Sequence, residues 1–316
     1  MITIFTENST KHPVLSFIKR CLRMFKKFIQ RKSFSLKYGG HYAVTRSLLV
    51  GLDELHINYN YNPKKIDDIN KTVLILSNIG ALETAIKLKQ KGKIEKLFAG
   101  PNIINNPGNE KDLLSSKEID GFIVNCEWTK ELYSIAVPEL KNKLYIWPAG
   151  VDEKYWSPIF IKKEKIALIY KKNDTNNFYL SVKRILKENG WQTLTIKYGD
   201  YKEKEFKDKL LESLISVFLS KGESQGLALV ESWSMDVPTL VWNPEIIEPK
   251  YKIRTSSCPF LNQENGLQWK ELNDLDNILK DDNVYLNIKP REWVMNNMTD
   301  KICAQKLIDI IKQNVK

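Results

Sequence analysis

Residues 214–242 constrain the fold of this 316-residue chain more than any other stretch. A short apolar run at 214–219 is followed by a polar loop with two glycines, and the spacing then predicts a helix from about Gly226 to Met235. A second apolar run follows Pro238. Short apolar runs bounded by glycine and proline are typical of buried strands. The stretch therefore predicts a strand, a helix and a second strand in succession.

Two carboxylates flank the start of this helix. Glu231 follows the apolar residues 227–230 and precedes Trp233, so at helical spacing it has apolar neighbours on nearly every side. A carboxylate removed from water needs a hydrogen-bonding partner. Glu223 lies in the loop before the helix, at the end of a buried strand, where open α/β sheets bind ligands. The free N–H groups and dipole of a helix N-terminus suit a phosphate.

At these residues the sequence resembles the donor-binding segment of retaining GT-B glycosyltransferases of the family 4 type, also called glycosyl transferases group 1. The family's two glutamates, separated by seven residues, stand here as Glu223 and Glu231. Gly-Leu lies between them at 226–227, and Asp-Val-Pro-Thr follows at 236–239. A solvated helix glutamate beside an unrelated loop glutamate is the simpler alternative.

The resemblance implies a role for each residue of this segment. Glu223 would face the donor sugar as a catalytic residue, and Glu231 would hold the nucleotide ribose. Ser224, Gly226 and Leu227 would bind the donor, the backbone amides meeting its diphosphate.

Other apolar runs extend the α/β pattern along the chain. They predict strands at residues 2–5, 72–77, 96–99, 122–125, 165–170 and 191–198. Helical patterns separate several of these runs, and such alternation implies parallel crossover connections.

The resemblance also implies the GT-B architecture, which is α/β with two Rossmann-like domains, an interdomain cleft and a C-terminal helix that crosses back to the first domain. A chain of this length accommodates two such domains. We expect an acceptor-side domain at 1–157 and a nucleotide-sugar-binding domain at 158–316. Residues 144–158 resemble the family's last strand and hinge, where Asp152 either orders the hinge or forms a plain turn. The helix at about 300–312 matches the returning helix.

A Gly39-Gly40 pair precedes His41 and a predicted helix at 42–55. Glycine lets backbone approach a ligand closely, and a helix N-terminus follows directly. The segment resembles the glycine-rich loop that faces the GT-B cleft, so Gly39 and Gly40 are donor-binding candidates. His41 is a catalytic candidate for contacting the reacting sugar or the acceptor. An ordinary turn with a structural histidine is the alternative.

Lys171 and Lys172 follow the strand that opens the second domain. In the family a basic pair in this region neutralises the donor diphosphate, but the expected second Lys-Gly is missing here. Lys183 or Arg184 on the following helix could replace it. A solvated lysine pair is the alternative interpretation.

The net charge of +11 is concentrated near the N-terminus. Residues 11–37 carry nine basic side chains and no acidic one. Within them, residues 13–32 predict an amphipathic helix whose apolar half is opposite a wholly basic half. Such a helix fits an anionic membrane interface, and packing on its own domain is the alternative. Nucleic acid is disfavoured because the aromatic residues lie on the apolar half.

Several classes of protein are excluded. The four cysteines are far apart and form no Cys-x-x-Cys pair, so neither a zinc site nor a disulfide framework is predicted. No apolar run approaches the roughly 20 residues of a spanning helix. We expect a cytoplasmic protein, on the inner face of the membrane if residues 13–32 bind lipid. Asp274 and Asp276 form an Asp-x-Asp sequence, but their apolar spacing indicates a surface helix with solvated acids.

These observations lead to a functional hypothesis. We expect a retaining, metal-independent glycosyltransferase that moves a hexose from a nucleotide diphosphate sugar, its substrate, to a glycan or lipid-linked hydroxyl acceptor. No cofactor and no metal are expected. The main alternative is a non-catalytic GT-B-like subunit docked on a membrane or a partner enzyme, and a GT-B epimerase or phosphorylase is a third.

Overall fold

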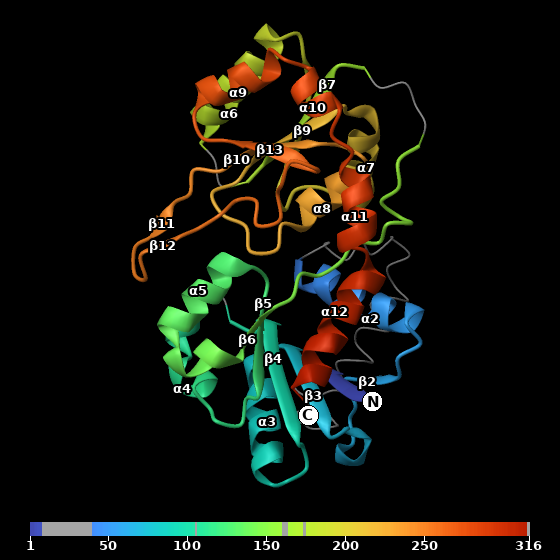
Figure 1. The fold of residues 1–316 in the computed structure, drawn as a ribbon, viewed down its shortest axis with the longest axis vertical. Coiled ribbons are helices and arrows are strands. Elements are labelled where there is room, and N and C mark those ends of the chain that lie inside the picture. The colour runs from blue at the N-terminus through green and yellow to red at the C-terminus, as the bar shows by residue number, and fades with distance from the viewer. Residues whose placement is uncertain (8–39, 105, 160–163, 173–174, 315–316) are drawn as a thin grey trace, which may run out of the picture.

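The protein forms two parallel β-sheets that lie one beyond the other along its longest axis (Figure 1). The structure is a computed structural model that describes residues 1–7, 40–104, 106–159, 164–172 and 175–314. The predicted helix at 13–32 and Gly39 lie outside these residues.

The first sheet has the strand order β2-β1-β3-β4-β5-β6, and every neighbouring pair is parallel. Its strands are β1 (Ile2–Phe5), β2 (Tyr59–Tyr61), β3 (Thr72–Ser77), β4 (Lys96–Asn102), β5 (Gly121–Val124) and β6 (Leu144–Ile146). The helical segments among them are α2 (Gly40–Glu54), η1 (Ile66–Asp68), α3 (Ile79–Gln90), η2 (Pro107–Asn109), α4 (Lys111–Leu114), α5 (Glu127–Ala136) and η3 (Pro138–Lys143).

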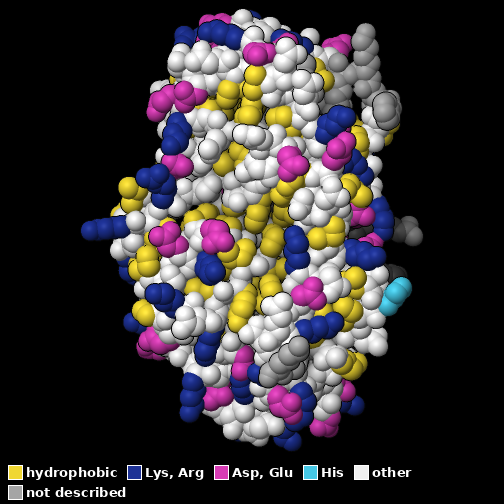
Figure 2. All heavy atoms as spheres, in the orientation of Figure 1, with side chains coloured by type: hydrophobic (Ala, Val, Ile, Leu, Met, Phe, Trp, Pro, Cys, Tyr) yellow, Lys and Arg dark blue, Asp and Glu magenta, His cyan; other side chains and the backbone are white. Residues whose placement is uncertain are grey.

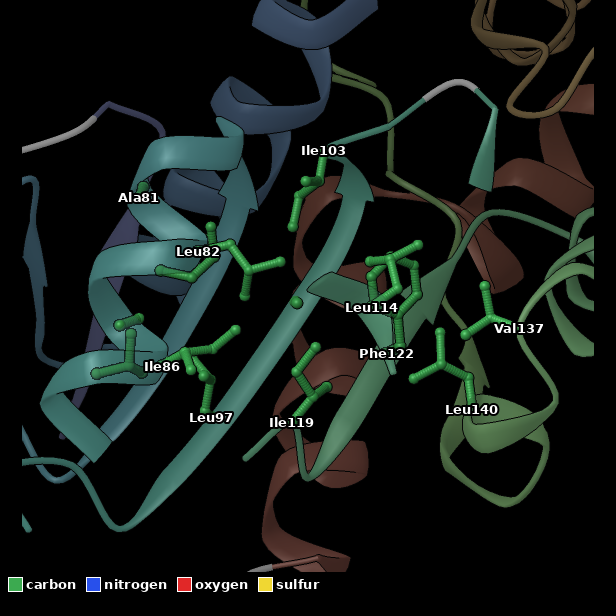
Figure 3. Close-up of a cluster of buried hydrophobic side chains, with 14 of the residues drawn as sticks. Ala81, Leu82, Ile86, Leu97, Ile103, Leu114, Ile119, Phe122, Val137 and Leu140 are labelled. Atoms are coloured by element: carbon green, nitrogen blue, oxygen red, sulfur yellow. The ribbon is translucent and has the colours of Figure 1, made fainter. Parts of the chain in front are cut away.

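Both faces of this sheet are buried by helices. Successive residues of a strand point to opposite faces, so alternate residues of each strand belong to different clusters. Val73 and Ile75 of β3 pack towards α3, α4 and α5, in the cluster that Figure 3 shows with Leu82, Phe122 and Leu140. The alternate β3 residues pack with α2 on the other face. The continuous apolar runs in the sequence follow from this burial on both sides.

The second sheet has the order β13-β10-β9-β7-β8 and is also parallel throughout. Its strands are β7 (Ile166–Lys171), β8 (Gln192–Lys197), β9 (Ile215–Leu219), β10 (Thr239–Trp242) and β13 (Gly266–Trp269). Its helices are α6 (Asn176–Glu188), α7 (Glu203–Glu212), α8 (Leu227–Ser234), α9 (Leu272–Leu279), α10 (Asn283–Leu286) and α11 (Pro290–Asn297). A separate antiparallel hairpin is formed by β11 (Ile247–Glu248) and β12 (Ile253–Arg254).

The chain passes between the two sheets twice, and the two passages pair with each other. Val151 N donates to Met298 O at 2.9 Å, and Asp300 N donates to Val151 O at 3.1 Å. The last helix, α12 (Asp300–Gln313), then packs on α2 beside the first sheet (Figure 1). The predicted return of the C-terminal helix to the first sheet is confirmed.

Gly51 makes the contact between α2 and α12 possible. A Cβ atom at this position would lie 2.2 Å from the carbonyl oxygen of Asp300 and 2.6 Å from Cβ of Ala304. The two helix backbones therefore approach each other more closely than any residue with a side chain allows at this point.

The surface also reflects this two-part arrangement. Figure 2 shows apolar side chains gathered along the middle of one face, where the upper and lower parts of the molecule meet. Within the described residues, no helix combines the length and the apolar character that crossing a bilayer requires.

Candidate functional site

A cavity of about 300 Å³ lies between the carboxyl ends of the two sheets. The first sheet contributes the start of α2, the ends of β4 and β5, and α5. The second contributes β7, β9 and the loop that leads into α8. Parallel sheets bind ligands at these ends of their strands.

Glu223 is fixed in this cavity by bonds to both its side chain and its backbone. Its Oε1 accepts from Lys172 Nζ at 2.8 Å and from Ser220 Oγ at 3.0 Å. Its backbone N–H donates to Ser256 O at 2.8 Å. The side chains of Glu223 and Lys172 are 16% and 19% exposed, so the pair is partly shielded from water but still reachable by a ligand.

The first sheet also holds this loop. Trp128 on α5 donates from Nε1 to the backbone oxygen of Glu223 at 2.9 Å. Asn125, directly after β5, donates from Nδ2 to Ser224 Oγ at 3.4 Å. These contacts join segments almost a hundred residues apart, and they position the loop against the opposite wall of the cavity.

Glu231 lies in the second turn of α8, is 2% exposed and also lines the cavity. Near it, the hydroxyls of Tyr170 and Tyr201 are 3.2 Å apart. Burial raises the pKa of both phenols, and the negative charges of Glu223 and Glu231 raise it further. Both tyrosines therefore keep their protons at neutral pH.

Gly226 and Leu227 form the start of α8 within the cavity lining. Gly226 has a φ of 64°, a left-handed conformation that glycine adopts at low cost. No side chain among the described residues caps this helix. Its first amide groups are therefore available to an anionic ligand.

The two candidate lysines point to opposite faces of the second sheet. Lys172 lines the cavity, on the same face as Tyr170, with its Nζ 4.5 Å from the centre of the Tyr198 ring. Lys171 is not part of the lining, and its Nζ donates to Asn176 Oδ1 at 2.6 Å. The alternation of side chains along a strand accounts for the separation.

The two basic residues that could replace the missing family lysine lie elsewhere. Lys183 and Arg184 are exposed on α6 and do not line the cavity, and Arg184 pairs with Glu188 at 3.8 Å.

Gly40 and His41 begin α2 at the edge of the cavity. A Cβ atom at Gly40 would meet no atom of the described residues within 4 Å. His41 also lines a second hollow of about 520 Å³, between α2 and the β1–β2 edge of the sheet. The histidine therefore borders two spaces at once.

Asp152 orders the passage between the sheets. Its Oδ1 accepts from the backbone N–H groups of Lys154 at 3.2 Å and Tyr155 at 2.9 Å. Its Oδ2 pairs with Arg46 of α2 at 3.4 Å. This carboxylate thus closes a turn and ties the turn to the first sheet's helix.

The acids of the Asp-x-Asp sequence have structural partners on α9. Asp274 accepts from the backbone N–H groups at the start of this helix, and Asp276 pairs with Lys280 and Asn189. Across the part of the chain that the structure describes, no group of three or more His, Cys, Asp and Glu side chains could hold a metal ion.

Comparison with known proteins identifies the fold. Neither a protein-family model nor a curated protein matches this sequence. The structure is similar to the apo form of the lipopolysaccharide outer core galactosyltransferase WaaB, with a TM-score of 0.59 and 12% identity over 99% of both chains. It is also similar to sucrose-phosphate synthase from Thermosynechococcus elongatus, with a TM-score of 0.57 and 10% identity over 99% of this chain and 98% of that one. The chain has the GT-B fold. A further similar structure is TarM, at a TM-score of 0.54 and 13% identity, where 84% of this chain aligns with 58% of the other.

The GT-B cleft contains residues that sequence reasoning missed. Asn102 ends β4, Asn125 directly follows β5, and Gln225 lies in the loop before α8, and all three line the cavity. The sequence could have indicated the two asparagines as site residues, since each stands at the carboxyl end of a buried parallel strand, where such sheets bind ligands. The predicted domain limits at residues 157 and 158 stay a prediction.

Proposed function

We propose that this protein is a retaining glycosyltransferase that moves a hexose from a nucleotide diphosphate sugar to a hydroxyl of a glycan or lipid-linked acceptor. One observation carries the proposal. Glu223, Glu231, Lys172 and the start of α8 all line a single cavity between the two sheets of a GT-B fold. The cavity thus combines a lysine and an uncapped helix start with two carboxylates.

The chemistry of each group suits one part of such a donor. The amides at the start of α8 and Lys172 would bind the diphosphate, since helix dipoles and lysines favour anions. They would also stabilise the charge that develops on the leaving diphosphate, a role that needs no metal. Glu231, buried and ionisable, would accept hydrogen bonds from the ribose diol, and Glu223 would face the sugar.

The names of two similar proteins agree with sugar transfer, since one is a galactosyltransferase and the other a sucrose-phosphate synthase. His41 lies between the cavity and the second hollow, a position from which it could contact the acceptor. An acceptor lying in the second hollow would reach the donor past this histidine.

We also propose that the protein acts in the cytoplasm at the inner face of a membrane, through residues 13–32. The support is the sequence alone, namely nine basic and no acidic side chains in residues 11–37. Flotation with anionic liposomes, comparing the full chain with one lacking residues 11–37, tests this location. Equal binding by both would contradict it.

A second candidate function is a non-catalytic GT-B-like subunit. The placement of the two lysines favours it. Of Lys171 and Lys172, only Lys172 lines the cavity, and one lysine neutralises only part of a diphosphate, which carries at least two negative charges. The two candidates differ in whether nucleotide sugars bind and are consumed.

A thermal-shift panel of UDP-, GDP- and ADP-glucose tests the proposed function. We expect one of the three to raise the melting temperature and to be hydrolysed slowly without an acceptor. Stabilisation by none of them and no hydrolysis would favour the non-catalytic subunit instead.

The ribose role is tested by Glu231→Ala, with Glu188→Ala on the exposed surface of α6 as control. Hydrogen bonds to a charged group are each worth about 1.5–3 kcal/mol, so affinity for the nucleotide sugar should fall roughly tenfold to a hundredfold. Unchanged affinity in a variant that folds normally by circular dichroism would show the ribose assignment to be wrong.

A further inference from the structure

Three amide side chains line the cleft cavity, and each has a buried polar atom that forms no hydrogen bond with the described residues. These atoms are Asn102 Nδ2, Asn125 Oδ1 and Gln225 Oε1. Asn125 and Gln225 are 9% and 8% exposed. A buried polar group without a partner costs about 1–3 kcal/mol. Three of them around one cavity indicate a bound molecule that supplies the missing partners.

The bonds that these amides do make leave their oxygens unsatisfied. Gln225 Nε2 donates to Ala149 O at 3.4 Å. If the Gln225 amide were flipped, its Oε1 would face Ala149 O, and two acceptors would repel each other. The orientation with Nε2 towards Ala149 O is therefore the favoured one. Asn125 Nδ2 donates to Ser224 Oγ at 3.4 Å. The serine hydroxyl can donate or accept, so either orientation of Asn125 leaves one polar atom unsatisfied.

The unsatisfied atoms include both kinds of hydrogen-bonding group. Asn102 offers a donor, Gln225 offers an acceptor, and Asn125 offers one or the other according to its orientation. A phosphate only accepts and an ammonium only donates, so neither satisfies all three. A hydroxyl does both, and a sugar ring presents several of them. The amides are also uncharged, so they favour a neutral polyol over the diphosphate.

The position of the amides assigns them to one part of the donor. Asn125 bonds Ser224, the neighbour of Glu223, and Gln225 lies two residues beyond Glu223. We propose that Asn102, Asn125 and Gln225 bind hydroxyl groups of the transferred hexose and so select which sugar is moved. This inference rests on the proposed function, which assigns the sugar of a nucleotide sugar to the space beside Glu223.

The three amides come from both halves of the molecule. Asn102 ends β4 and Asn125 directly follows β5 in the first sheet, while Gln225 belongs to the loop before α8 in the second. The sugar hydroxyls would therefore be contacted from both walls of the cleft. A domain that opened would release two of the three contacts together.

The experiment compares two ligands, the nucleotide sugar identified in the thermal-shift panel and the matching nucleotide diphosphate. Affinities are measured by titration calorimetry for the wild type, Asn125→Ala and Gln225→Ala. One lost neutral hydrogen bond is worth about 0.5–1.5 kcal/mol, so each variant should bind the nucleotide sugar roughly threefold to tenfold more weakly. Affinity for the diphosphate should stay within twofold. Gln305→Ala, on the exposed side of α12, is the control and should change neither.

Each other outcome has a defined meaning. An equal loss for both ligands would assign Asn125 and Gln225 to cleft closure and would overturn the inference. Unchanged binding of the nucleotide sugar would overturn it as well. If no nucleotide sugar binds the wild type, the proposed function fails, and the inference with it. Should an alanine variant fail to fold, Asn125→Ser and Gln225→Ser provide smaller polar replacements for the same comparison.

Discussion

Asp300 should make the stability of this protein depend on pH. Its carboxylate is 1% exposed, at the first residue of α12 where the chain returns to the first sheet. Neither carboxylate oxygen meets the distance and angle of a hydrogen bond with another described residue. Burial raises its pKa from 3.8 to about 6, although the nearby Ser47 hydroxyl and Arg46 guanidinium lower it in part.

The size of the effect follows from the pKa shift. The folded pKa is higher than the unfolded one, so the folded protein holds this proton more tightly. The free energy of unfolding therefore falls as the pH rises from about 4 to about 6, and the loss is complete above both values. A shift of about two units corresponds to about 3 kcal/mol. Part of this loss has already occurred at pH 4, which is close to the unfolded pKa of 3.8, so the change between pH 4 and pH 8 is about 2–3 kcal/mol.

Asp300→Asn removes the titrating group and keeps its shape. The free energy of unfolding, from urea titrations followed by tryptophan fluorescence, is compared between variant and wild type from pH 4 to pH 8. The asparagine variant should gain about 2–3 kcal/mol on the wild type between these limits. Asp309→Asn, on the exposed side of the same helix, is the control. A difference between Asp300→Asn and the wild type that does not change with pH would refute the reasoning.

Three further predictions concern the helix crossing and the cleft. Gly51→Ala should lower the free energy of unfolding by about 1–3 kcal/mol, because its Cβ would overlap α12. Urea titration measures this, and an unchanged midpoint would contradict the close packing. Lys172→Met should weaken nucleotide diphosphate binding about tenfold or more in calorimetry, while Lys171→Met stays within twofold. Equal losses would contradict the separation of the two lysines. Trp128→Phe removes the hydrogen bond to Glu223 O, so nucleotide-sugar affinity should fall severalfold, and unchanged affinity would contradict a role for this bond.

Much of the fold was predictable because the central strands of both sheets are buried on both faces. Residues 73–76 are apolar throughout and residues 214–219 are apolar except for Ser216, which distinguishes both runs from the loops around them. The extent of β4 was harder to predict. It continues through Gly100 and Pro101 to Asn102, because Asn102 pairs with Ser77 after an irregularity in the register. Pairing with a neighbouring strand is a tertiary property that the local sequence does not contain.

Short elements were missed for a related reason. Strands β2, β11 and β12 contain three residues or fewer, too few to show any periodicity. Their existence depends on the partner beside them. The place of β2 at the edge of the first sheet, next to β1, was not predictable for the same reason.

The candidate site was predictable where it is contiguous in sequence. Glu223 and Glu231 lie within one strand, loop and helix, so their spacing was visible. The opposite wall was not, because Asn125 and Trp128 reach this loop from about a hundred residues away. Choosing between Lys171 and Lys172 required knowing which face of β7 lines the cavity.

The pairing of Lys172 with Glu223 bears on how a donor would enter the cleft. A diphosphate bound at the start of α8 would compete with the Glu223 carboxylate for the same ammonium group. Breaking a buried ion pair is expensive when it leaves one charge without a partner. Here Ser220 Oγ also donates to Glu223 Oε1, so the carboxylate keeps a hydrogen bond if Lys172 turns towards phosphate. The exposed fractions of 19% and 16% lower the cost further, since water reaches both side chains. The pair can therefore order the cleft residues before a donor binds and still release its lysine to an incoming diphosphate.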